Sequence, residues 1–231
     1  MELSTVSPAA LFTSLIGGIL PALLWLWFWL KEDRLHPEPR VRIMTAFIAG
    51  MASIPFAILL ERGVNNLAIN TGLVILLWAI IEEVLKFTAA RLTALGKKDC
   101  DEPIDPVIYL ITAALGFAAV ENALFLINPL ISGDILAGIV TGNLRFVGAS
   151  LLHVLSSGTI GVFMAFAFFK KHSVKRLVLW FGLAAAIGLH TAFNLFIIDA
   201  KDSEVIKVFS VVWIAIVVLM LVIEKIKTIK K

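Results

Sequence analysis

The sequence predicts an all-α, polytopic membrane helical bundle of about seven transmembrane helices, forming a single domain over residues 1–231. Three observations predict this fold class: 60% of the residues are hydrophobic, seven apolar stretches recur along the chain, and basic residues gather in alternate loops. The mean hydropathy is +0.96, and soluble domains are nearer half apolar, so we expect lipid to be the solvent of this chain. The net charge of only +3 argues against a nucleic-acid partner, and the single cysteine, Cys100, excludes an internal disulfide.

Each apolar stretch is close to the ~20 residues that a bilayer core requires. The seven stretches are Pro8–Leu30, Ile43–Leu60, Thr71–Ala90, Pro106–Ile127, Asn143–Phe169, Leu177–Ile198 and Val205–Ile223. We expect all of them to be helical, because an isolated spanning segment must satisfy its own backbone hydrogen bonds in lipid. Glu2 and no basic residue precede the first stretch, so we expect a retained span and not a cleaved signal. The fourth and fifth stretches are joined by Pro129–Gly142, which suits either a plain loop or a partly re-entrant hairpin.

Individual stretches carry features of their own. Trp25, Trp27 and Trp29 lie near the end of the first stretch and are typical interfacial anchors. Pro21 and Pro55 predict kinks in the first and second stretches, which a bundle tolerates. The third to sixth stretches carry polar groups at depth, whereas the first, second and seventh do not and are therefore expected to be scaffold.

The basic residues predict the orientation of the bundle. Fifteen of the 20 Lys and Arg residues follow the first, third and fifth stretches or lie in the tail, whereas the alternate loops hold only Arg62, Lys201 and Lys207. By the positive-inside rule, the N-terminus is expected outside and the C-terminus in the cytoplasm. The alternation holds at every loop, and an incorrect number of spans would break it.

Ionisable side chains lie inside four of the predicted spans. Such residues cost several kcal/mol at mid-bilayer unless they are paired or hydrated, and by default they mark functional sites. At ~1.5 Å per helical residue, these groups fall about 10–17 Å from the outer surface, in one slab. Glu82 and Lys86 are also four residues apart and share a helix face. The candidate site residues are Glu82, Glu83, Lys86, Glu121, Asn122, His153, His190 and Asn194.

This set of side chains favours hydrolysis. Two histidines and a carboxylate are a common ligand set for zinc that leaves one position for water, and the expected metal ligands are Glu121, His153 and His190. Glu82 or Glu83 would act as the general base, while an amide would stabilise the developing oxyanion. Without metal, a desolvated glutamate beside a histidine would activate water directly. Both routes cleave a carbonyl compound, and the membrane setting favours a peptide bond in or near a transmembrane segment.

Structural readings compete with this hypothesis at each residue. The Glu82–Lys86 pair alone suits a buried ion pair, and a lone His153 or His190 suits an interhelical hydrogen bond. The acidic run that contains Asp105 suits a solvated cytoplasmic turn. A proton-coupled transporter would use the same acids and histidines as a relay, although the short chain shows no inverted repeat. A non-catalytic membrane partner with an inert polar core is the third reading, and the matched depth of the groups favours the enzyme.

At these residues the chain resembles the PrsW family of intramembrane proteases, which belongs with the wider group containing the CAAX prenyl endopeptidases and bacteriocin-processing proteins. The matching pieces are Glu82-Glu83-x-x-Lys86, Phe117-x-x-x-Glu121-Asn122, His153 with Arg145 upstream, and His190-x-x-x-Asn194. They cover Trp78 to Asn194, about half of the chain, and their order and spacing agree with the family.

The resemblance implies an integral-membrane endopeptidase, multi-pass in the prokaryotic cell membrane, with a catalytic core over about residues 71–198. Its substrate would be a membrane-anchored protein or peptide, such as an anti-sigma factor already trimmed outside the membrane. Zinc is the implied metal, and a metal-free glutamate mechanism is the alternative. The CAAX endopeptidases have a histidine where this chain has Glu121, so a prenylated substrate is not implied. The implied roles are water activation by Glu82 and Glu83, metal or oxyanion binding by His190 and Asn194, and completion of the polar pocket by Glu121 and His153.

Overall fold

The computed structural model describes residues 7–200 and 202–229, and all regular structure within them is helical. The helices are α1 Pro8–Leu30, α2 Arg40–Asn65, α3 Thr71–Ala90, α4 Asp105–Ile131, α5 Ile135–Leu144, α6 Ser150–Phe166, α7 His172–Asp199 and α8 Asp202–Ile226. Short turns of other helical types adjoin them: the 3₁₀ turn Lys31–Asp33 and the π-helical turns Arg91–Leu95 and Arg145–Ala149. The predicted all-α bundle is confirmed.

Among the described residues, six helical segments are long and apolar enough to cross a membrane. One of them is the continuous run Ile135–Phe166, in which α5, a π-helical turn and α6 form a single helix. The remaining predicted span corresponds to α3, which has 20 residues but carries Glu82, Glu83 and Lys86. All three of these side chains are buried against neighbouring helices. Their charges therefore face protein and not lipid, where such groups are tolerated.

The segment Pro129–Gly142 is the junction of two helices. α4 continues through its first residues, and α5 begins at Ile135 after a tight turn. Gly133 has a φ of 74° in this turn, a left-handed conformation that glycine adopts without a Cβ clash. The Asp134 side chain then accepts a hydrogen bond from the Ala137 N–H at 2.9 Å and caps α5. The fifth helical segment therefore starts at Ile135, earlier than predicted, and Pro129–Gly142 is a helix–turn–helix junction and not a plain loop.

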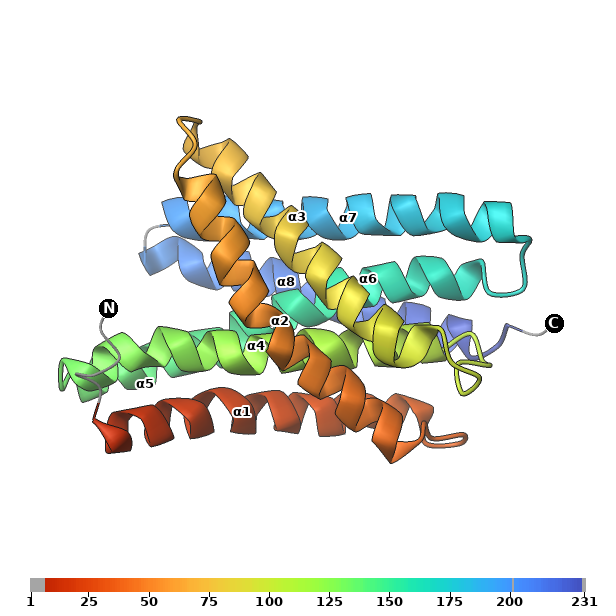
Figure 1. The fold of residues 1–231 in the computed structure, drawn as a ribbon, viewed down its shortest axis with the longest axis horizontal. Helices are drawn as coiled ribbons and strands as arrows, with labels where there is room; N and C mark the ends of the chain where they lie inside the picture. The colour runs from red at the N-terminus through yellow and green to blue at the C-terminus, as the bar shows by residue number, and fades with distance from the viewer. Residues whose placement is uncertain (1–6, 201, 230–231) are drawn as a thin grey trace.

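α4 forms the centre of the bundle and packs against α1, α2 and α6. α2 and α3 form an antiparallel hairpin that crosses the other helices obliquely (Figure 1). Glycines allow α2 and α4 to approach closely: a Cβ on Gly50 would lie 2.0 Å from the Ala113 carbonyl oxygen, and a Cβ on Gly116 would lie 2.0 Å from the Phe47 carbonyl oxygen. Small residues serve this purpose in membrane helix packing. The crossing holds α3 where its acidic residues reach α6 and α7.

The basic loops lie at one end of the bundle. Residues 31–39, 91–104 and 167–171 lie together with the end of α8 at the right of Figure 1, and α1 begins at the opposite side. We refer to this side as the basic end. The arrangement agrees with the alternation of basic loops along the sequence.

Candidate active site

A cavity of about 610 Å³ lies inside the bundle, and every helix from α2 to α8 contributes lining residues. Five of the eight predicted site residues line it: Glu82, Glu121, His153, His190 and Asn194. The other three are buried: Glu83, Lys86 and Asn122. Because these three bond to residues of the lining or to their close neighbours, the structure brings the whole predicted set into one region.

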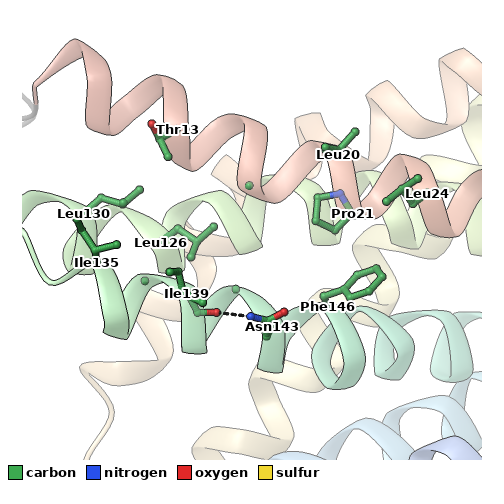
Figure 2. Close-up of a pocket in the computed structure, with 13 residues that line it drawn as sticks. Thr13, Leu20, Pro21, Leu24, Leu126, Leu130, Ile135, Ile139, Asn143 and Phe146 are labelled. Atoms are coloured by element: carbon green, nitrogen blue, oxygen red, sulfur yellow. Dashed lines mark hydrogen bonds between the residues drawn. The ribbon is translucent and has the colours of Figure 1, made fainter.

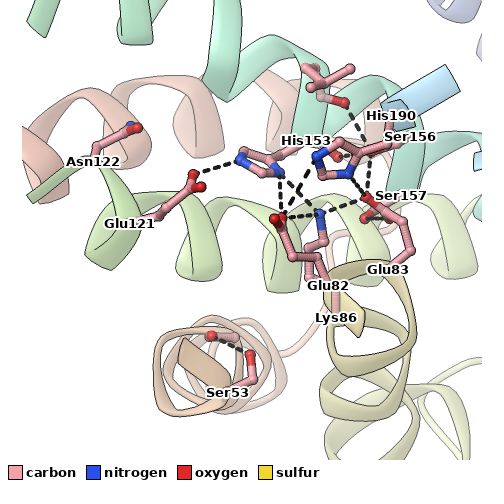
Figure 3. A network of polar contacts seen from close by, with 12 residues as sticks. Ser53, Glu82, Glu83, Lys86, Glu121, Asn122, His153, Ser156, Ser157 and His190 are labelled. Atoms are coloured by element: carbon pink, nitrogen blue, oxygen red, sulfur yellow. Dashed lines mark hydrogen bonds and ion pairs between the residues drawn. The ribbon is translucent and has the colours of Figure 1, made fainter. Parts of the chain in front are cut away.

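Three donor atoms from three helices converge at this cavity (Figure 3). Glu82 Oε2 on α3 lies 3.9 Å from His153 Nδ1 on α6 and 3.8 Å from His190 Nε2 on α7. All three side chains are buried, and the imidazole rings meet edge to face with centroids 5.4 Å apart. Glu82 Oε2 has no hydrogen-bond partner among the described residues, although buried polar atoms normally have one. The three atoms therefore form a prepared place for a water molecule, a substrate group or a metal ion.

The neighbouring carboxylate, Glu83, is fully engaged and orients His190. Its Oε1 accepts hydrogen bonds from Lys86 Nζ at 2.6 Å and from Ser156 Oγ at 2.8 Å, and its Oε2 accepts one from Ser157 Oγ at 2.9 Å. His190 Nδ1 lies 2.7 Å from Glu83 Oε1. A carboxylate only accepts, so the ring proton sits on Nδ1 and the free Nε2 of His190 faces Glu82. Glu83 therefore acts through His190 and does not line the cavity.

Lys86 is the positive centre of the network, and none of its side chain is exposed. Its Nζ lies 2.6 Å from Glu83 Oε1 and 3.6 Å from Glu82 Oε2. The same nitrogen lies 3.0 Å from His153 Nδ1. Because an ammonium group only donates, His153 Nδ1 accepts this bond and the ring proton sits on Nε2. His153 Nε2 then donates to Glu121 Oε2 at 2.9 Å, so the network determines the tautomer of both histidines.

Glu121 lies on the Nε2 side of His153 and belongs to a second chain of contacts (Figure 3). Its Oε2 accepts a hydrogen bond from Arg145 Nη2 at 2.5 Å. Arg145 Nε donates in turn to Asn122 Oδ1 at 2.5 Å, and Asn122 Nδ2 donates to Ser150 Oγ at 3.0 Å. Arg145 begins the π-helical turn between α5 and α6, and such turns are frequent at functional sites. Asn122 therefore holds Arg145 and does not face the cavity.

The carboxylate that converges with both histidines is Glu82, whereas the sequence prediction for the metal ligands has Glu121 in that place. One ligand atom each of Glu82, His153 and His190 lie within 4.8 Å of one another. Glu121 is instead paired with Arg145. Both acids line the cavity, but they lie at different nitrogens of His153: Glu82 near Nδ1 and Glu121 at Nε2.

Sequence reasoning missed several residues that support the site. Ser156 and Ser157 bind Glu83, and they follow His153 by three and four residues, so a helical reading would have placed them on its face. Glu61 also lines the cavity from α2, which the sequence assigned to scaffold. Glu61 lies beyond Pro55 and near the end of α2, so its position in the sequence did not indicate that it reaches the cavity.

A second hollow lies between α1, α4 and α5 (Figure 2). It has a volume of about 450 Å³, and its lining includes Leu20, Pro21, Leu126 and Ile139. None of the described side chains that line it is ionisable. It therefore lacks the groups that hydrolysis requires and suits an apolar occupant.

The donor set of the polar cavity fits a metal ion. One carboxylate oxygen and two imidazole nitrogens are usual protein ligands of catalytic zinc. The Glu83 contact with His190 Nδ1 also matches the outer carboxylate that commonly orients a ligating imidazole. Glu82 Oε2, which lacks a partner in the described structure, is an atom that an ion would satisfy. Lys86 Nζ, 3.0 Å from His153 Nδ1, is a neighbouring cation that would compete with it.

A multi-pass helical bundle that buries a carboxylate and two imidazoles around one point has the fold and donor set of an intramembrane metallohydrolase. The family model described as PrsW family intramembrane metalloprotease matches residues 38–223, and the chain belongs to this family. It is therefore a multi-pass membrane protein and a protease, and its substrate is a protein.

Curated relatives cover most of the chain. It is 26% identical over 191 residues to "Protease PrsW" of Geobacillus kaustophilus (strain HTA426), which is 80% of this chain and 79% of the relative. The namesake of Clostridioides difficile (strain 630) is 25% identical over 185 residues, 77% of this chain and 76% of the relative. That of Bacillus subtilis (strain 168) is 25% identical over 200 residues, 84% of this chain and 86% of the relative. No solved structure matches the chain significantly.

Proposed function

We propose that this protease cleaves a peptide bond within or near a transmembrane segment of a membrane-anchored protein, such as an anti-sigma factor, and that Glu82 activates the attacking water. The observation that carries the proposal is the position of Glu82 Oε2. It is buried, has no hydrogen-bond partner among the described residues, and lies 3.9 Å from His153 Nδ1 and 3.8 Å from His190 Nε2. A water at this point would lie beside a carboxylate base and ring nitrogens of both histidines.

The proposed topology has seven spans, with α3 included, the N-terminus outside and the basic end in the cytoplasm. The gathering of the basic loops at one end of the bundle supports this orientation. The burial of the α3 charges supports a span whose polar side faces protein. The proposed catalytic core extends from α3 to α7, over about residues 71–198, and α2 adds part of the cavity wall.

Each side chain has a role that its contacts support. Glu82 would take a proton from the water and return it to the leaving amine. His190 is held by Glu83 through Nδ1, so its unprotonated Nε2 would accept a hydrogen bond from the water or ligate a metal ion. Asn194 lies one turn further along α7 and lines the same cavity, where its amide would donate a hydrogen bond to the oxyanion. General base and oxyanion stabilisation would thus come from different helices.

Glu82, His153 and His190 would hold the metal that the family description implies, and zinc suits this donor set. When bound, the ion supplies Lewis-acid polarisation. A carboxylate that ligates through one oxygen keeps its other oxygen for the proton of the water. Glu121 and Arg145 would then form the far wall of the pocket, where their ion pair orients the Nε2 side of His153.

His190→Ala is expected to lower cleavage by about 10²-fold or more, because it removes a group at the reacting centre together with the partner of Glu83. The measurement is the yield of cleaved single-span substrate co-reconstituted with the protease in proteoliposomes. His172→Ala is the matched control, because His172 is exposed at the start of the same helix. Equal loss in both variants would contradict the proposal. So would solute uptake driven by a pH gradient without any peptide product, which a transporter predicts.

A further inference from the structure

A second group of carboxylates lies at the basic end, outside the cavity. Asp33 ends the 3₁₀ turn after α1, Glu38 lies in the following loop, and Asp105 is the first residue of α4. One oxygen from each side chain lies within 4.8 Å of the other two. The sequence predicted a solvated turn at Asp105, but Asp105 is only 1% exposed and Asp33 only 5%. The solvated turn is wrong for Asp105, because the α1–α2 connection covers the start of α4, whereas Asp101 is exposed as predicted.

Two of these carboxylates are held in place by neighbours. Asp105 Oδ2 accepts hydrogen bonds from the backbone N–H groups of Asp101 at 2.7 Å and Glu102 at 2.6 Å. Glu38 Oε2 accepts a hydrogen bond from the Tyr109 hydroxyl. The cluster is therefore built and oriented by surrounding structure, as a binding site requires.

The third carboxylate, Asp33, has one unsatisfied oxygen. Asp33 Oδ2 is buried and has no hydrogen-bond partner among the described residues. Within residues 7–200 and 202–229, no ion pair joins Asp33, Glu38 or Asp105 to a lysine or arginine. Buried carboxylates without a cation repel one another, and an unsatisfied charged oxygen is expensive.

Two arrangements would relieve this repulsion: a shared proton or a bound cation. Burial raises the pKa of the Glu38 carboxyl to about 8, so either a proton or a cation would stabilise the three carboxylates. A proton shared between Glu38 and Asp105, whose side chains hydrogen-bond to each other, would relieve that pair but would leave Asp33 Oδ2 without a partner. Oxygens around one Ca²⁺ lie at 2.3–2.6 Å from the ion and hence up to about 5 Å apart. The unsatisfied oxygen of Asp33 therefore favours a cation that all three side chains can share.

We propose that Asp33, Glu38 and Asp105 bind a hard divalent cation, Ca²⁺ or Mg²⁺, at the basic end of the bundle. The ligands are oxygens alone, which suits these ions and distinguishes this site from the group with two histidines in the cavity. The ion pins the connection between α1 and α2 to the start of α4. Because α4 is the central helix and α2 crosses it, binding stabilises the frame that holds α3.

Tb³⁺ luminescence of the purified full-length protein in detergent tests the site directly, because Tb³⁺ occupies oxygen sites and is excited through nearby aromatic rings. Trp29 lies one turn before Asp33, and Tyr109 bonds to Glu38. We expect saturable sensitised emission that Ca²⁺ or Mg²⁺ displaces, and the displacing ion identifies the preferred occupant. The same ion should raise the midpoint of thermal unfolding by several degrees.

Asp33→Asn should weaken Tb³⁺ binding at least tenfold and abolish the shift in the thermal midpoint, and Glu38→Gln should do the same if the first variant folds poorly. Asp101→Asn is the matched control, because its exposed side chain lies in the loop just before Asp105 and outside the cluster. Glu82→Gln should retain the signal. The proposal is overturned by absence of saturable emission, by emission that survives both cluster variants, or by emission that disappears in Glu82→Gln.

Discussion

Glu82→Gln is expected to lower the rate of peptide cleavage by about 10³-fold while the protein still accumulates and folds. The substitution keeps the shape of the side chain and removes the base that faces the cavity. Stability should change little, because Glu82 Oε2 has no hydrogen-bond partner in the described structure and Lys86 keeps Glu83 at 2.6 Å. The rate is measured by mass spectrometry of a single-span substrate in proteoliposomes.

Glu224→Gln is the control for this variant. This substitution makes the same chemical change on α8, at a side chain that is 63% exposed and pairs with Lys227. Its cleavage rate should equal that of the unaltered protein. Cleavage by Glu82→Gln at the same rate as the control would remove Glu82 from the mechanism and leave Glu121 as the alternative carboxylate.

Lys86→Met is expected to destabilise the fold by about 3–5 kcal/mol, because it leaves the buried Glu83 carboxylate without its cation. The Lys86 side chain is entirely buried, and its Nζ contacts Glu83 and His153. The double variant Glu83→Gln/Lys86→Met should recover most of the loss, since it removes both charges together. The free energy of unfolding is measured by titration with SDS in mixed detergent micelles.

Lys227→Met provides the comparison for this second prediction. Lys227 also pairs with two glutamates, Glu32 and Glu224, but this group lies at the surface. Exposed ion pairs contribute little, so a much smaller change is expected. If Lys86→Met is as harmless as Lys227→Met, or if the double variant is no more stable than the single one, the buried ion pair does not organise the α3 network.

The sequence predicted well what depends on depth and composition. The helical spans follow from the length of the apolar stretches, and the matched depths of Glu82, Glu121, His153 and His190 predicted a shared polar pocket. Rotation about a helix axis is a different matter, because it depends on packing that a single sequence does not show. Glu82 and Glu83 are adjacent, yet one faces the cavity and the other binds Ser156 and Ser157 behind it.

The sequence left one feature of the fold open and misread another. The junction around Gly133 depends on a single left-handed residue, which allows α5 to begin early. The residues around Asp105 are typical of a solvated turn. Its carboxylate is buried only because the α1–α2 connection packs over it. The first outcome depends on the local conformation of the turn, and the second depends on long-range packing.

Cleavage in water enriched in ¹⁸O tests the central claim most directly. If the groups around Glu82 Oε2 activate a water molecule, the new C-terminal carboxylate of the product should carry one ¹⁸O atom, and Glu82→Gln should yield almost no labelled product. Product that forms without ¹⁸O, or labelled product that accumulates equally in the Glu82→Gln variant, would contradict this account of the site.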